Sequence, residues 1–356
     1  MHLPTFPNAH RHLAAALLAL AATTPALAQQ ASPERRTLAG DRVAVYNLVG
    51  SMRVEAGSGS SVEVEVTRRG ADAGQLRIET GEVRGRESLR VVYPFDVIRW
   101  SDMGRRSTTQ LQVDRDGVFY GGRGAGRRVR ISGDDGADAS ADVVVRVPKG
   151  RDIAVYLAVG EATVRNVDGR ILVDVGSADV TTSGTRGHLS LDTGRGATKV
   201  SDAEGDLLLD TGSGSVTIDN VRADEISVDA GSGGMTGSNL RARSLKLDLG
   251  SGGTRLTGVA VDDLWIDSGS GEVDVALTTA TRSVFLDSGS GDVTLRLPAS
   301  FGATLEVDTG SGGIDTDIPI TITRRSRSSL VGTIGDGKGR VRIDSGSGEV
   351  RLVRGS

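Results

Sequence analysis

Aspartate is the residue type in this sequence that combines a chemically active side chain with a regular spacing. Nine aspartates each follow a short apolar stretch and precede, by one residue, a glycine-rich corner that is most often Gly-Ser-Gly. Successive members of the set lie 18, 18, 19, 19, 19, 20, 21 and 36 residues apart. The set comprises Asp174, Asp192, Asp210, Asp229, Asp248, Asp267, Asp287, Asp308 and Asp344. Carboxylates that recur at one period can form a row, which could shape turns or bind cations.

The row has two interpretations. If the repeats stack, neighbouring carboxylates lie about 5 Å apart and repel by roughly 1 kcal/mol at water-like screening, which something must offset. The favoured interpretation is a structural turn ladder, in which each Asp oxygen accepts amide N–H groups of its own corner in an Asx-type turn. The alternative is calcium held between repeats. The calcium-binding nonapeptide repeat places Asp after its glycines and has a shorter period, so we predict no metal site.

The elements that position these aspartates are predicted to be short β-strands. Apolar and polar residues alternate before the corner, as in Leu245–Asp248, and after it, as in Val273–Leu277. Such alternation puts the apolar side chains on one face of a strand and the Asp on the other. We therefore predict an all-β fold, a parallel and right-handed β-helix (β-solenoid) of about 12 coils with a period of about 18–21 residues. A β-sandwich is the rival, but it gives no reason for one motif to keep one spacing.

Composition excludes several classes of function. The 356 residues contain no Cys, which excludes disulfides, thiolate metal sites and a lipid-modified cysteine. After residue 28 the sequence holds one histidine, His188, so a multi-histidine metal site is impossible. The formal net charge of -4 gives no electrostatic case for nucleic-acid binding. No cofactor is predicted.

The first 28 residues are predicted to be a signal peptide. An apolar run at 13–22 is followed by the small-x-small pattern Ala26–Ala28, which is typical of a cleavage site. The alternative is a buried N-terminal helix. No later segment reaches 18 consecutive apolar residues. We therefore predict an exported chain with no membrane span, which is periplasmic, on the cell surface or secreted.

Residues 29–40 are expected to be a lead-in, and residues 41–356 a β-solenoid repeat domain with two insertions. The first insertion, at about 86–141, is rich in aromatic residues and glycine. Long loops often bind ligands; the alternative is an excursion that packs its own aromatic side chains over the solenoid. The second insertion, at about 323–340, is a basic, Ser/Gly-rich loop. It is expected to be a solvated surface loop, with contact to acidic envelope polysaccharide as the alternative.

An aromatic pair marks a possible ligand face. Trp265 and Phe285 stand two residues before the aspartate in adjacent repeats and are predicted to point outward. Such a pair could stack on a sugar ring or anchor a partner. Equally, an insertion or a second molecule could cover this face. The predicted ligand face consists of this pair together with Arg324, Arg325 and Arg327 of the basic loop.

The sequence favours a protein that is not an enzyme. Its Gly-Ser-Gly corners lack the strand-to-helix context of a nucleophile elbow, and no catalytic residue is predicted. The alternative is a carbohydrate-active enzyme, a polysaccharide lyase or hydrolase on a β-helix scaffold. Such an enzyme would cluster unlike acidic and basic residues on a few coils, and no break of that kind interrupts the repeat.

Three features together resemble a known family. They are Val143–Gly150 (Val-Val-Val-Arg-Val-Pro-Lys-Gly), Gly160–Val164 and the repeated Asp-x-Gly-Ser-Gly-x-Val. Over residues 40–356 the chain is similar to a bacterial β-strand-repeat family of unknown function whose members are described as adhesins, and to the head-GIN adhesin domain. The resemblance implies an exported β-helical fold and brings no catalytic residue or cofactor. We therefore expect a structural or interaction protein that binds envelope or extracellular glycan or protein.

Self-association is a further expectation. Residues 350–356 follow a strand pattern directly, and no capping element is evident after them. An uncapped coil exposes unpaired backbone groups, which would favour end-to-end contact between copies.

Overall fold

The computed structural model describes residues 1–2, 32–120 and 126–355. Residues 32–356 form one compact unit, which contains every described strand. Apart from its first two residues, the predicted signal peptide at 1–28 lies outside the described residues. Among the described helices, none has the length and apolar character needed to cross a membrane.

The regular structure of the described residues consists of strands and two short 3-10 helices, η1 (Ala73–Gln75) and η2 (Ser101–Met103). The described residues contain no α-helix. The first strands are β1 (Glu34–Leu38), β2 (Arg42–Ala56), β3 (Val62–Arg69), β4 (Arg77–Val83), β5 (Arg86–Val92), β6 (Val97–Arg99), β7 (Thr108–Val113), β8 (Arg127–Ser132) and β9 (Ser140–Val147). They are followed by β10 (Arg151–Arg165), β11 (Asp168–Ser183), β12 (Arg186–Arg195), β13 (Thr198–Ser201), β14 (Leu207–Ser213), β15 (Val216–Ser232), β16 (Met235–Ser251), β17 (Thr254–Ser270) and β18 (Val273–Leu277). The last are β19 (Ser283–Ser288), β20 (Val293–Leu297), β21 (Ala303–Thr309), β22 (Ile314–Thr316), β23 (Ile320–Arg325), β24 (Ser329–Ile334), β25 (Gly339–Ser345) and β26 (Val350–Arg354).

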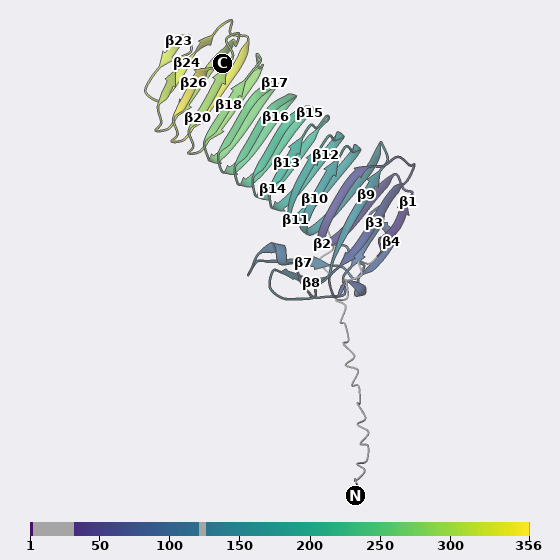
Figure 1. The fold of residues 1–356 in the computed structure, drawn as a ribbon. Coiled ribbons are helices and arrows are strands. Elements are labelled where there is room, and N and C mark those ends of the chain that lie inside the picture. The colour runs from purple at the N-terminus through teal and green to yellow at the C-terminus, as the bar shows by residue number, and fades with distance from the viewer. Residues whose placement is uncertain (3–31, 121–125, 356) are drawn as a thin grey trace. The chain divides into compact units, whose positions relative to one another are not determined.

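Parallel pairing between successive repeats confirms the predicted β-solenoid. β16 pairs with β15 on one side and with β17 on the other, so that Asp229, Asp248 and Asp267 lie side by side. The same pairing continues along the stack of coils in Figure 1. The rival β-sandwich is wrong, because equivalent motifs lie on neighbouring strands of one parallel stack.

Alternation along each strand separates the core from the outer surface. In β16, Leu245, Leu247 and Leu249 are buried, whereas Lys246 and Asp248 between them are exposed. Burying one leucine side chain stabilises a fold by roughly 2 kcal/mol. Stacked coils repeat this pattern, so that a continuous aliphatic core runs through the inside of the solenoid.

Each coil also has a second corner, opposite the glycine-rich one in the order of the chain. At this corner the structure differs from the two short, separate strands that were expected for each coil. β15, β16 and β17 each bend there without a break, because one residue in each adopts a positive φ. The residues with this conformation are Asn166, Gly184, Asp202, Asn220, Asn239 and Gly258, with φ between 52° and 67°. Asparagine, aspartate and glycine tolerate this left-handed region better than other residues do.

Close approach between coils explains the glycines of the Gly-x-Gly corner. A Cβ atom on Gly250 would lie 2.3 Å from the carbonyl oxygen of Gly231 in the preceding coil, and one on Gly252 would lie 2.2 Å from that of Gly233. The same contact recurs from coil to coil, so each corner adds to two columns of glycine. Corner amides donate between coils, as from Gly233 to the carbonyl of Ser251 at 3.0 Å.

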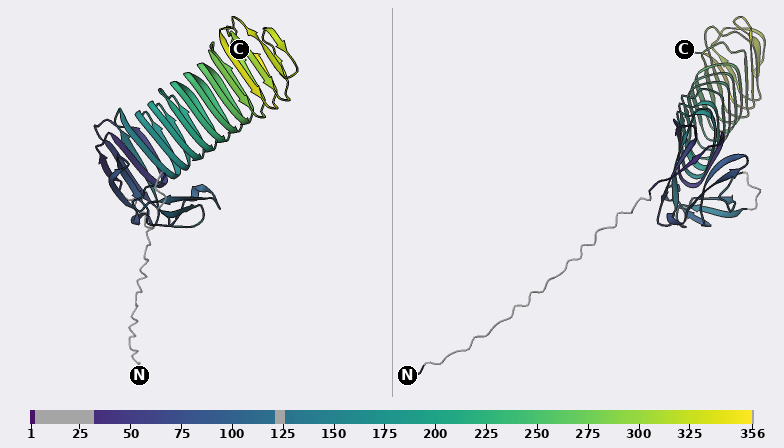
Figure 2. Two further views of the ribbon diagram at one scale, coloured as in Figure 1. Left: turned by 180° about the vertical axis from the view of Figure 1, so that it is seen from behind. Right: turned by 90° about the vertical axis from the view of Figure 1, so that its right-hand side faces the viewer.

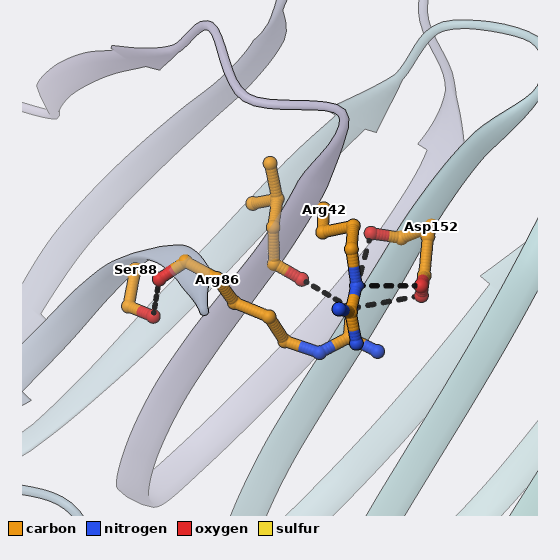
Figure 3. A network of polar contacts seen from close by, with 5 residues as sticks. Arg42, Arg86, Ser88 and Asp152 are labelled. Carbon is orange, nitrogen blue, oxygen red and sulfur yellow. Dashed lines mark hydrogen bonds and ion pairs between the residues drawn. The ribbon is translucent and has the colours of Figure 1, made fainter. Parts of the chain in front are cut away.

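Antiparallel strands close the N-terminal end of the stack. β2 pairs in parallel with β10, β5 and β9, and the outer strands β4, β3 and β1 then pair antiparallel. Arg86 of β5 ties this cap to the first coils, since its Nη1 donates to Asp152 Oδ1 at 2.8 Å and to the Val43 carbonyl at 3.4 Å (Figure 3). Arg42 Nε lies 3.3 Å from Asp152 Oδ2 in the same network.

The opposite end of the stack is closed by a change of strand order. β25 lies between β19 and β21, and β26 lies between β20 and β22. Beyond β21, β24 and β23 continue the sheet with antiparallel pairing. The expected bare coil is therefore wrong, because residues 350–354 lie inside the stack. The argument for end-to-end association fails with it, since the outer strands carry Arg35, Arg36, Arg324 and Arg325, and charged edge strands oppose pairing.

The segment predicted as the first insertion is divided between two sheets. β5 and β9 belong to the main sheet, whereas β6, β8 and β7 form a separate three-stranded sheet in that order. Figures 1 and 2 show this small sheet beside the N-terminal coils. The buried Phe119 anchors the insertion, because its ring meets that of Tyr46 in β2 edge-on at 5.8 Å between centroids.

Candidate functional site

The nine aspartates occupy paired positions along one outer face of the stack. Their order follows the strands and not the sequence: Asp174, Asp192, Asp210, Asp229, Asp248, Asp267, Asp287, Asp344 and Asp308. Parallel strands lie about 4.8 Å apart, so each carboxylate repels its neighbour by roughly 1 kcal/mol in water-like surroundings. We call this set the Asp row.

The corners are not closed by the expected Asx-type turns. In the part of the chain that the structure describes, no corner amide donates to a carboxylate of the Asp row. The residue after each Asp points inward instead, and in the last coils of the stack its hydroxyl closes the corner. Ser288 Oγ donates to the Gly291 carbonyl at 3.0 Å, and Thr309 Oγ1 donates to the Gly312 carbonyl at 2.7 Å. The Asp does not reach these amides because side chains alternate along the strand, so the Asp points outward. The corner amides instead donate to a neighbouring coil.

Burial and mutual repulsion raise the pKa of several carboxyl groups in the Asp row. Burial, and then the charge of Asp192, raises the pKa of Asp174 to about 7. Burial and the neighbouring Asp210 also raise the pKa of Asp192. Burial, followed by the carboxylates on both sides, raises the pKa of Asp229 and of Asp287. Asp174 is therefore expected to titrate near neutral pH.

Asp174 borders a shallow cavity where the Asp row meets the insertion. The cavity has a volume of about 450 Å³ and is lined by Arg84, Tyr120, Tyr156, Asp174, Val175, Gly176, Asp192 and Gly194. Tyr156 and Tyr46 occupy the next two positions of the row, with their rings stacked at 4.4 Å between centroids. The Tyr120 hydroxyl lies over Gly176, where a Cβ atom would be 1.9 Å from it. Aromatic rings thus shield the first carboxylate of the row.

The Asp row spreads its carboxylates singly along the stack. Among the described residues, no three or more His, Asp or Glu side chains are grouped so that they could hold a metal ion. Calcium takes six to eight oxygen ligands. The row supplies one carboxylate per coil, and corner carbonyls such as that of Ser251 already accept amides of a neighbouring coil.

The aromatic pair lies on the same outer face, two residues before the Asp row along each strand. Trp265 and Phe285 pair across β17 and β19, and their rings stack with centroids 6.2 Å apart and planes 13° apart. Lys246 Nζ lies 5.0 Å from the centroid of the Trp265 ring, and Arg342 is the strand partner of Phe285 on the other side. We call these four residues the aromatic platform. The insertion lies beside the N-terminal coils in Figures 1 and 2, away from β17. The side chains of Trp265 and Phe285 are partly exposed.

The three arginines of the predicted ligand face are not brought together. Arg324 does share the row of Phe285, but β25, β21 and β24 lie between them, which puts it roughly 19 Å away. Arg325 pairs with Leu330, so it points to the opposite face of the hairpin. Arg327 lies in the turn between β23 and β24. Arg342 is the cation that the structure places beside Phe285.

A larger groove lies between the insertion and the outer surface of β10–β13. Its volume is about 1040 Å³. Trp100, Met103 and Thr109 line it from the insertion side. The hydroxyl of Thr109 lies 3.1 Å from that of Ser177 in β11, and this contact joins the wall of the groove to its floor.

Unlike charges gather in this groove. Glu161 and Asp179 pair across β10 and β11, Arg195 and Lys199 come from the next coil, and Arg106 comes from the insertion. None of the five side chains takes part in an ion pair within the described residues. Sequence reasoning missed this cluster because the groove around it forms only where the insertion folds back on the coils. The signal in the sequence that could have pointed to this groove is the charged residues at outward positions of the coils nearest the insertion.

A family model and a solved structure are similar to this chain. A model of the Toastrack DUF4097 family matches residues 132–353. A search of curated proteins finds no match. The crystal structure of a proposed cell adhesion protein from Clostridium sporogenes ATCC 15579 is 10% identical in sequence. Its alignment covers 91% of this chain and 99% of that chain, with a TM-score of 0.19.

Proposed function

This chain belongs to the Toastrack DUF4097 family, and we propose that it is an exported, non-catalytic, adhesin-like protein whose solenoid presents a glycan-binding surface. The proposed ligand is glycan of the cell envelope or of the extracellular surroundings. The chain would then act in the periplasm or outside the cell. The signal-peptide pattern at residues 1–28 supports export. The solenoid domain would span residues 41–356.

The observation that carries this proposal is the aromatic platform. Trp265 and Phe285 present two nearly parallel rings on a flat outer surface, although most outward positions of a soluble solenoid are polar. Two outward rings on adjacent coils have no role in the core. Aromatic rings of this kind commonly mark a binding surface.

The polar groups beside the platform suit a sugar ligand. Asp267 and Asp287 lie two residues along the same strands and face the same side, so their oxygens could accept hydrogen bonds from sugar hydroxyls. Lys246 and Arg342 flank the rings with donors only. A neutral or acidic sugar that stacks on the rings would thus meet both acceptors and donors.

A glycan array followed by titration calorimetry tests the proposal. The folded protein should retain one class of envelope or extracellular glycan, and Trp265→Ala should weaken that binding by at least about tenfold, which corresponds to roughly 1.4 kcal/mol. Leu208→Ala is the matched control. Leu208 lies in the same row three coils away and is 46% exposed, so its removal should change affinity less than about twofold. Binding that survives loss of both aromatic rings would reject the platform as the site.

The groove beside the insertion favours a second candidate, a carbohydrate-active enzyme. A lyase or hydrolase needs carboxylates for acid–base chemistry, and cations help to bind an acidic sugar. Glu161 and Asp179 supply the carboxylates. Arg195 and Lys199 supply the cations, so that the four residues lie on three adjacent coils. One carboxylate has a competing structural role, since Asp179 Oδ1 accepts the Ala197 amide at 2.8 Å.

New reducing ends or new unsaturated ends distinguish the two candidates. If the groove is catalytic, incubation with an acidic polysaccharide should release such ends, and Glu161→Gln should abolish the release without changing retention by the platform. If the protein only binds, the polysaccharide should be recovered intact after prolonged incubation.

A further inference from the structure

One coil of the stack is out of sequence order, and its neighbours form a slot of matching shape. The coil consists of β25 and β26 and lies between the coil of β19 and β20 and the coil of β21 and β22. Among the described strands, β19 has no direct pairing with β21. Without residues 339–354, these two strands would face each other across about 10 Å, with unpaired backbone groups on both edges.

Backbone groups hold the coil in the slot from both sides. Gly346 donates its amide to the Ser288 carbonyl at 2.8 Å, and Gly310 donates its amide to the Ser345 carbonyl at 2.8 Å. Inside, Val341, Ile343, Val350 and Leu352 join the continuous core with at most 1% of their surface exposed. The slot therefore supplies two hydrogen-bonding edges and an apolar floor.

Two further contacts hold the coil to the walls of the slot through its backbone amides. The amide of Glu349 donates to Asp292 Oδ1 at 2.8 Å, and the amide of Arg354 donates to Asp317 Oδ1 at 2.8 Å. Both carboxylates belong to the walls of the slot and not to the coil itself. Any copy of this chain carries both halves of these contacts.

A short exposed turn connects β24 to the coil. It spans residues 335–338, and Gly335 and Gly337 in it have φ of 54° and 72°. The amide of Gly337 donates to the Ile334 carbonyl at 3.1 Å, and the Asp336–Lys338 ion pair is largely exposed. Opening this turn breaks few contacts of its own, and short hinges of this kind permit exchange of an element between identical chains.

We propose that residues 339–354 form an exchangeable coil, and that the slot between β19–β20 and β21–β22 binds the same segment of a second copy of this chain. An exchanged pair remakes every backbone and side-chain contact of the slot, so only the hinge differs between the two states. Closure within one chain has the advantage of a high effective concentration. Exchange is therefore favoured where copies are crowded, as in a concentrated solution or on a surface. The proposal is independent of glycan binding.

Cysteine pairs placed in the full-length chain test the exchange, because the chain has no cysteine of its own. Ser290 and Ser347 are exposed and occupy equivalent places in the adjacent corners of the wall and the coil. Ser290→Cys and Ser347→Cys chains would be mixed at high concentration, warmed, diluted and oxidised. Exchange predicts disulfide-linked heterodimers at about tenfold or more above a matched mixture of Ser232→Cys with Ser347→Cys. Equal yields in the two mixtures would overturn the proposal.

A hinge variant gives a second readout that needs no cross-link. Proline cannot adopt the positive φ of Gly337 and lacks the amide that donates to Ile334. Gly337→Pro should therefore disfavour the closed turn and raise the dimer fraction, measured by light scattering, several-fold at equal concentration. Gly85→Pro imposes a similar misfit in the β4–β5 turn, where φ is 71°, and should leave the dimer fraction unchanged. A monomeric Gly337→Pro chain with an intact fold would contradict exchange.

Discussion

Tyr156 lies directly opposite Asp174 across the parallel pair of β10 and β11. The first carboxylate of the Asp row therefore has a phenol ring on one side and Asp192 on the other. Tyr120 of the insertion lies over the same coil at Gly176. This burial, together with the charge of Asp192, raises the pKa of Asp174 to about 7. The place where the insertion meets the solenoid is thus one point at which stability should depend on pH.

The first prediction concerns Asp174→Asn. Because the folded chain holds this proton more tightly than the unfolded chain does, the stabilisation is present below about pH 4 and is lost as the pH rises to about 7. The loss should be about 1–2 kcal/mol after allowance for solvent screening at a partly exposed group. Asparagine cannot ionise, so the variant should be more stable than the parent by that amount at pH 8 and nearly equal to it at pH 4.

Urea unfolding at the two pH values measures this difference. Asp248→Asn is the matched control, because Asp248 stands in the same row but is exposed. Its effect should be smaller at pH 8 and should change less between the two pH values. A destabilised Asp174→Asn at pH 8 would show that the ionised carboxylate is needed by its neighbours.

The second prediction concerns the glycine columns. A Cβ atom on Gly250 would lie 2.3 Å from the backbone oxygen of Gly231, and backbone cannot move aside as a side chain can. Gly250→Ala should therefore destabilise the solenoid by about 2–3 kcal/mol. Gly253→Ala is the control in the same corner, since the nearest atom to its Cβ is the Glu272 carbonyl oxygen at 3.8 Å. Thermal unfolding should separate the two variants, and equal melting temperatures would show that the corners can relax.

The period and the alternation predict the solenoid, because both are local properties of each repeat. The strand order at β19–β25–β21 could not be predicted in the same way. Asp308 precedes Asp344 in sequence, yet Asp344 is the strand neighbour of Asp287. Every coil carries the same Asp-x-Gly-x-Gly corner there, so the pattern fits any order of coils. The hairpin of β23 and β24 is the connection through which the chain returns to the gap.

The same distinction between local repeat pattern and long-range contact applies to the candidate sites. Trp265 and Phe285 could be found from the sequence because equivalent positions of adjacent repeats must pair. The groove could not, because it depends on the contact of Thr109 with Ser177, which joins an irregular segment to a regular one. Periodicity says nothing about where such a segment will dock.

The third prediction concerns the N-terminal cap drawn in Figure 3. The Arg86 side chain is 15% exposed and donates to three acceptors, whereas the Arg42 side chain is 58% exposed and makes one ion pair with the same Asp152. Arg86→Ala should cost about 2 kcal/mol, because it leaves a partly buried carboxylate without its main partner. Arg42→Ala should cost less than about 1 kcal/mol. Hydrogen exchange of the β5 amides should quicken in the first variant only; equal protection in both would mean that the cap does not depend on Arg86.

The last prediction concerns ions and the Asp row. Like charges along one face repel, and mobile ions screen this repulsion. Raising NaCl from about 20 mM to about 500 mM should therefore raise the melting temperature of the native chain, because the Debye length falls from above 20 Å to below 5 Å. The row offers one carboxylate per coil, fewer oxygens than calcium requires. Calcium and magnesium at equal ionic strength should then raise the melting temperature equally, and EGTA should not lower it. A rise specific to calcium, lost again on addition of EGTA, would instead assign the row to calcium binding between coils.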